Sequence, residues 1–190
     1  KGVYLMSYPH HGKYEWLPIL YDSVAKLKPG KIIEFGPGSG RTTITMAKSL
    51  EENKIDGHIY SYDIWDDDYW GKRSVTQAEY EAWGVSKYIT LNHLDFFEWV
   101  KKPEKFDFML FDINNTSEKL LKLYNGVKEQ IDDGSVVFFE GGSKIRDSYG
   151  HIGGGMYDIK DYLNYKVLTG NVKYSASAIY NTEKHDLDFS

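Results

Sequence analysis

The chain has 190 residues, a formal net charge of −5 at pH 7 and no cysteine, which excludes thiolate catalysis, cysteine-ligated zinc and iron–sulfur clusters. The acidic balance is not typical of a general nucleic-acid binder, and a hydrophobic share of 41% excludes a wholly disordered chain. No apolar run is long enough for a membrane span, and the first residues lack the apolar core of a secretory signal. We therefore expect a single α/β domain over residues 1–190, located in the cytoplasm.

Short apolar runs typical of strands alternate with helical patterns over residues 17–139. We expect strands over 31–35, 58–62, 88–94, 106–111 and 135–139. Between and before them we expect helices over 17–27, 41–52 and 120–131, a helix opened by a capping box from Thr76 to Glu79, and a short helix capped by Asp95. Repeated strand–helix units predict a parallel sheet with helices on both faces.

The remaining residues predict the edge of this sheet. After a glycine-rich stretch that ends at Gly155, we expect a short helix over 157–163 and two strands over 165–168 and 174–180. Two strands without an intervening helix indicate an antiparallel hairpin at one edge. The predicted fold class is therefore α/β, with a doubly wound, mostly parallel sheet of seven strands and an antiparallel edge hairpin.

The most informative stretch is the glycine loop, which we define as residues 36–40, between the first predicted strand and a helix. Glycines let the backbone turn sharply and approach a ligand, and the N-terminus of the helix presents free N–H groups there. A dinucleotide-binding loop would need glycine at the position of Arg41, and no Gly-Lys-Ser/Thr string for phosphate binding is present. What remains is an acid-x-Gly-x-Gly-x-Gly pattern that starts at Glu34.

This loop resembles motif I of the class I S-adenosylmethionine-dependent methyltransferases, and the resemblance extends over nearly the whole chain. In that family an acid at the end of the second strand holds the ribose hydroxyls, as Asp63 would here, and an acid after the third strand meets the adenine amino group, as Asp95 would. The resemblance implies a Rossmann-like fold and S-adenosyl-L-methionine as the cofactor. The cofactor-binding residues that it implies are Glu34, Gly36, Pro37, Gly38, Ser39, Gly40, Asp63, Ile64, Asp95, Phe96 and Asp112.

Methyl transfer from a sulfonium is an in-line displacement, so catalysis requires positioning of the acceptor and, for an alcohol or amine, a base. Asp112 and Glu140 are predicted at the ends of adjacent strands, where two carboxylates could share a divalent cation or place a base. The metal-dependent catechol-type O-methyltransferases carry Asn after the second acid, whereas this chain has Gly141, and we therefore expect no metal. The predicted catalytic residues are Asp112, Glu140 and His151, with His10 and His11 as alternative bases and Asn114 or Asn115 as further oxygen ligands in the metal-dependent alternative.

We interpret the sequence as a methyltransferase that acts on a small molecule, with oxygen as the expected acceptor atom. A nucleic-acid methyltransferase would more often carry Asn/Asp-Pro-Pro-aromatic after the fourth strand, and no proline follows Asp112 here. The expected partners are a small-molecule acceptor, no nucleic acid and no membrane, and a homodimer is compatible with the sequence. Three alternatives stay open: a protein methyltransferase, an aminopropyltransferase-like enzyme, which the acidic run Asp66–Asp68 would suit, and a non-catalytic module that binds S-adenosylmethionine.

Overall fold

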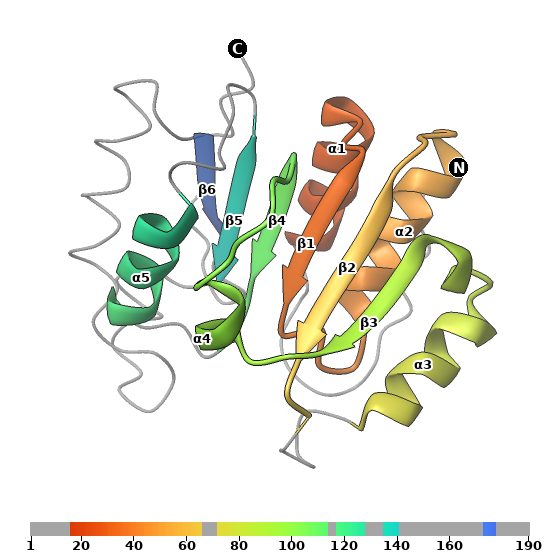
Figure 1. Cartoon of the computed structure of the whole chain (residues 1–190). Helices are drawn as coiled ribbons and strands as arrows, with labels where there is room; N and C mark the ends of the chain where they lie inside the picture. The colour runs from red at the N-terminus through yellow and green to blue at the C-terminus, as the bar shows by residue number, and fades with distance from the viewer. Residues whose placement is uncertain (1–15, 66–71, 114–116, 128–134, 141–172, 178–190) are drawn as a thin grey trace.

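The computed structural model describes residues 16–65, 72–113, 117–127, 135–140 and 173–177, which contain a six-stranded sheet with helices on both faces (Figure 1). The strands are β1 (Lys31–Phe35), β2 (His58–Asp63), β3 (Ile89–His93), β4 (Phe108–Phe111), β5 (Val136–Glu140) and β6 (Lys173–Ser177). The helices are α1 (Trp16–Leu27), α2 (Arg41–Glu52), α3 (Arg73–Ala82), α4 (Phe96–Trp99) and α5 (Ser117–Val127), with a 3₁₀ turn η1 (Ser86–Tyr88). Neighbouring strands all pair in parallel, in the order β3-β2-β1-β4-β5-β6. The order reverses between β1 and β4, and this is the topological switch point of the sheet.

The core has two layers, one on each face of the sheet, because successive strand residues point to opposite faces. Ile33 and Phe35 of β1 lie in a cluster with side chains of α4 and α5, whereas Ile32 lies in a cluster with side chains of α1, α2 and α3. All four residues of β4 are buried, as the apolar run in the sequence predicts for a central strand. The doubly wound, parallel arrangement is therefore present.

Within the described residues, the element boundaries that periodicity predicts are confirmed within a few residues, except at α3. The end of the helix expected over 120–131 lies outside the described residues. This helix begins at Arg73, with Lys72 as its N-cap, so the prediction of a capping box at Thr76 is wrong. Thr76 lies inside the helix and is fully buried, and its hydroxyl donates to backbone carbonyl oxygens instead of accepting a hydrogen bond from a backbone N–H at a helix N-terminus.

The edge of the sheet is described in part. Strand β6 covers residues 173–177, where the sequence predicts a strand over 174–180, and it pairs with β5 in parallel. The expected strand over 165–168 and the expected helix over 157–163 lie outside the described residues, so the edge hairpin and the total of seven strands stay predictions. Within the described ranges, no helix combines the length and the apolar character that crossing a bilayer requires.

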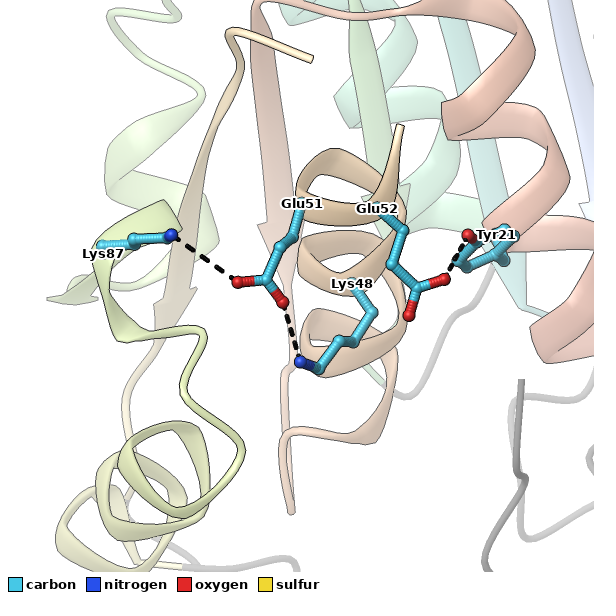
Figure 2. A network of polar contacts seen from close by, with 5 residues as sticks. All are labelled: Tyr21, Lys48, Glu51, Glu52 and Lys87. Carbon is cyan, nitrogen blue, oxygen red and sulfur yellow. Dashed lines mark hydrogen bonds and ion pairs between the residues drawn. The ribbon is translucent and has the colours of Figure 1, made fainter. Parts of the chain in front are cut away.

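Polar contacts anchor the C-terminal end of α2, the helix that follows the glycine loop (Figure 2). Glu52 accepts a hydrogen bond of 2.7 Å from the Tyr21 hydroxyl of α1. Glu51 pairs with Lys48 at 2.8 Å and with Lys87 of η1 at 3.6 Å. Each such surface pair contributes little to stability, but together they link α2 to α1 on one side and to η1 on the other.

The amino ends of three strands meet at Asp107. Its Oδ2 accepts hydrogen bonds from the backbone N–H groups of Gly30 and Lys31, at 2.9 and 2.8 Å. Its own N–H donates to Lys31 O at 3.0 Å, and its carbonyl oxygen accepts from Val136 N at 2.9 Å. This one residue therefore holds β1 against β4 and β4 against β5.

Replacing Asp107 by alanine should lower the free energy of unfolding by about 1–2 kcal/mol, because two backbone N–H groups lose a charged acceptor. The measurement is urea denaturation followed by circular dichroism. Asp56→Ala, which removes another exposed carboxylate shortly before β2, is the control. Equal denaturation midpoints for the two variants would contradict the role of Asp107.

Candidate functional site

The carboxyl ends of β1, β2 and β4 are joined by backbone hydrogen bonds that continue beyond the strands. Gly36 N donates to Tyr62 O of β2 at 3.1 Å. Asp112 N, directly after β4, donates to Phe35 O of β1 at 3.0 Å. The loops that leave these strands therefore lie along one edge at the switch point, where open α/β sheets bind their ligands.

The glycine loop contains three glycines with left-handed φ angles. These are 78° at Gly36, 51° at Gly38 and 84° at Gly40, and a residue with a side chain would pay about 1–2 kcal/mol in this region. Gly36 carries a second constraint, because an added Cβ would overlap the backbone carbonyl of Asp112. The loop closes with a 2.7 Å bond from Gly40 N to Pro37 O and continues directly into α2. The backbone conformation therefore favours glycine at all three positions, and at Gly36 it leaves no room for a side chain.

Glu34 is fully buried at the end of β1, next to this loop. Its Oε1 accepts a hydrogen bond of 2.6 Å from the Thr42 hydroxyl. Its Oε2 accepts from the hydroxyls of Thr43 and Ser61, at 2.6 and 2.5 Å. Burial raises the pKa of Glu34, and the hydroxyl donors oppose that rise. The Glu34 carboxylate thus links β1, β2 and the start of α2 through hydrogen bonds. Its predicted part in cofactor binding stays a prediction.

Asp63 ends β2 at the same edge of the sheet. Its Oδ1 accepts a hydrogen bond of 3.0 Å from Trp65 N, and Trp65 has a φ of 47°. Ile64, between these two residues, and Leu94, directly after β3, are 39% and 37% exposed. A carboxylate acceptor therefore lies beside exposed apolar side chains, a combination that suits a sugar hydroxyl attached to a flat base.

Asp95 caps α4, and its predicted role as an N-cap is confirmed. Its Oδ1 accepts a hydrogen bond of 2.5 Å from Phe97 N. The Phe96 ring is buried, with its centroid 5.5 Å from that of Phe35 and 4.8 Å from that of Phe111. This ring belongs to the core, and the predicted part of Phe96 in cofactor binding stays a prediction.

The two candidate catalytic acids lie at neighbouring strand ends. Phe111 of β4 pairs with Phe139 of β5, and Asp112 and Glu140 are the residues that directly follow them. The adjacency that the sequence predicts for their backbones is therefore present. His151, the third predicted catalytic residue, lies outside the described residues.

Several further candidates also fall outside the described part of the chain: His10, His11, Asp66–Asp68, Asn114 and Asn115. Across the residues that are described, no group of three or more His, Cys, Asp or Glu side chains is placed to hold a metal ion.

Sequence reasoning missed Lys119, near the start of α5. Its ammonium group donates a 3.0 Å hydrogen bond to the carbonyl oxygen of Ile113, the residue after Asp112. Burial lowers the pKa of Lys119, with the Asp95 carboxylate acting in the opposite direction. No spacing rule links a lysine at this position to the end of β4, so only the tertiary structure reveals it.

The chain matches a known protein family. The family described as Methyltransferase domain matches residues 33–140, more than half of the chain. None of the curated proteins shows significant sequence similarity to the chain.

Solved structures share the fold at low sequence identity. An O-methyltransferase from Bacillus cereus, in complex with SAH, has a TM-score of 0.64 and 13% identity over 85% of this chain and 72% of that one. TomG from Streptomyces achromogenes, an O-methyltransferase of tomaymycin synthesis in complex with SAM, has a TM-score of 0.54 and 15% identity over 67% and 55%. The SAH-bound methyltransferase PaMTH1 from Podospora anserina has a TM-score of 0.55 and 13% identity over 67% and 52%. The chain spans little more than half the length of the latter two proteins.

Gly36→Ala should destabilise the protein more than Gly84→Ala. Both positions have a positive φ, of 78° and 71°, so both variants pay a conformational penalty of about 1–2 kcal/mol. An added Cβ at Gly84 has nothing within 4 Å, whereas at Gly36 it overlaps the Asp112 carbonyl. Thermal unfolding of the two variants measures the difference, and equal melting temperatures would contradict the close approach at Gly36.

Glu34→Gln should change how stability depends on pH. Because the pKa of Glu34 is raised in the folded state, the folded protein binds more protons than the unfolded chain above a pH of about 4.3. The stability of the wild type should therefore fall relative to that of the variant as the pH rises from there, by up to about 1.4 kcal/mol per pH unit. Urea denaturation at several pH values tests this, and parallel profiles would show that the pKa of Glu34 is not raised.

Proposed function

The chain belongs to the Methyltransferase domain family, and on that basis we propose that it is an S-adenosylmethionine-dependent methyltransferase that methylates an oxygen atom of a small molecule. The observation that carries the proposal is the glycine loop at the switch point, with left-handed φ angles at Gly36, Gly38 and Gly40 and with Asp63 on the neighbouring strand. A glycine-rich backbone that a ligand can approach closely, next to a carboxylate at a sheet edge, suits contact with a nucleoside.

The residues present fit this cofactor. The Asp63 carboxylate can accept hydrogen bonds from both ribose hydroxyls, and the exposed side chains of Ile64 and Leu94 offer apolar contacts to the adenine. The backbone of the glycine loop and the first N–H groups of α2 suit the carboxylate of the methionine part, because a helix N-terminus favours an anion. The Asp95 carboxylate, beside Leu94, would meet the adenine amino group.

When bound, the cofactor supplies a methyl group on a sulfonium, which the acceptor oxygen attacks in line to leave S-adenosylhomocysteine. The work of this chain is then to orient the acceptor and to take up the proton that the acceptor loses. Asp112 and Glu140 lie at adjacent strand ends beside the loop, and we assign proton removal to one of them or to His151, without a metal.

The proposal includes the parts of the fold that are not described. Residues 1–190 form one domain, and the strand over 165–168 joins β6 as the seventh strand in an antiparallel hairpin. The O-methyltransferase activities named for the structural neighbours support oxygen as the acceptor atom.

Isothermal titration calorimetry tests cofactor binding directly. The wild type should bind S-adenosylmethionine and S-adenosylhomocysteine, and Asp63→Ala should weaken both by about 1–3 kcal/mol because the ribose hydroxyls lose their acceptor. Asp56→Ala is the matched control, since it removes a carboxylate at the other end of β2. Binding of NADH, with no response to either S-adenosyl ligand, would overturn the proposal.

Mass spectrometry of products from a panel of phenols and alcohols then identifies the reaction. A gain of one methyl group supports the proposal, and unchanged turnover after exhaustive chelation supports catalysis without a metal. An aminopropyl product would instead assign the chain to the aminopropyltransferase alternative. Activity that chelation abolishes and magnesium restores would make Asp112 and Glu140 metal ligands.

A further inference from the structure

Helix α3 contacts the glycine loop through Thr76. Figure 1 shows α3 near the carboxyl ends of the strands, on the β3 side of the sheet. Thr76 is 0% exposed, and its Oγ1 lies 2.8 Å from Gly38 O and 3.2 Å from Lys72 O. The hydroxyl has one proton to donate, and the shorter distance favours the loop carbonyl over the carbonyl of its own helix.

This bond sets the direction of one peptide unit in the loop. In a planar trans peptide the C=O of one residue and the N–H of the next point in opposite directions. Anchoring Gly38 O on α3 therefore turns the N–H of Ser39 away from α3. Gly38 has a φ of 51°, a conformation that glycine also leaves readily, so the loop needs an external contact to hold it.

Tyr80, one helical turn after Thr76, makes the second contact from the same face of α3. Its hydroxyl donates to Thr43 Oγ1 at 2.7 Å, and Thr43 in turn donates to Glu34 at 2.6 Å. Its ring packs on the last residue of the loop, since a Cβ added to Gly40 would lie 2.5 Å from Cε1 of Tyr80. The two side chains thus contact the middle of the loop, its end and the first turn of α2.

We propose that Thr76 and Tyr80 are positioning residues for cofactor binding, with Thr76 holding the Gly38–Ser39 peptide in the orientation that presents the Ser39 N–H to the ligand. This inference rests on the proposed function, in which the glycine loop binds the cofactor. Neither side chain is a catalytic residue, because both act through the loop. The proposal also explains why Thr76 is a threonine inside a helix, where its hydroxyl does not serve as a cap.

Thr76→Val and Thr76→Ser separate the hydroxyl from the shape of the side chain. Valine keeps the branched shape and loses the donor, and serine keeps the donor and loses the methyl group. Titration calorimetry with S-adenosylhomocysteine should show about fivefold to tenfold weaker binding for Thr76→Val and near wild-type binding for Thr76→Ser. Val75→Ala, at the neighbouring residue that is 54% exposed, should bind as the wild type does.

The outcomes separate this inference from the proposed function. A wild type that does not bind S-adenosylhomocysteine overturns the proposed function, and the inference with it. A wild type that binds, together with a folded Thr76→Val that binds equally well, overturns the inference alone. Equal losses for valine and serine also overturn it, because they indicate packing. If Thr76→Val does not fold, Tyr80→Phe carries the test: a folded variant with weaker binding supports the inference, and one with unchanged binding overturns it.

Discussion

The buried carboxylate of Glu34 is the interaction on which the arrangement of the site depends. A carboxylate without hydrogen-bond partners would be very costly to bury, and three hydroxyls, from Thr42, Thr43 and Ser61, offset part of that cost by donating to Glu34. Two of these donors belong to the first turn of α2 and the third to β2. These hydrogen bonds therefore hold the start of α2 and the strand β2 against the end of β1. The glycine loop connects β1 to α2 across this contact.

The two faces of the sheet contribute differently to the site. On one face, the Thr76 hydroxyl of α3 bonds the glycine loop, and hydroxyls of α2 bond Glu34 at the end of β1. On the other face, the ring of Phe35 lies 5.0 Å from Trp99 and 5.8 Å from Phe111, so an aromatic cluster fixes α4 against the ends of β1 and β4. Asp95 and Asp112 are positioned by this apolar layer. At this edge of the sheet, polar contacts therefore support the glycine loop, and apolar packing supports Asp95 and Asp112.

The fold could be predicted well from the sequence because apolar periodicity and turn residues are local signals. The strand, glycine loop and helix over residues 31–52 follow from such signals, and so does the cap at Asp95. The prediction of a capping box at Thr76 was wrong because it depended on local spacing alone. A threonine three residues before a glutamate also occurs in the middle of a helix, where a distant carbonyl, here that of Gly38, accepts the hydrogen bond of its hydroxyl. The partners of Glu34 and the contact of Lys119 with Ile113 carry no local signal either, since they join residues that only the tertiary fold brings together.

The lack of room for a side chain at Gly36 limits how this edge of the sheet can change in evolution. Because this residue lies against the carbonyl of Asp112, a change in the backbone at Asp112 would have to be accommodated by the glycine loop. Under the proposed function, the glycine loop contacts the cofactor and Asp112 lies on the side of the acceptor. Under the proposed function, new acceptor preferences can evolve through side chains at this edge, whereas an insertion that reroutes the backbone at Asp112 would also alter the glycine loop.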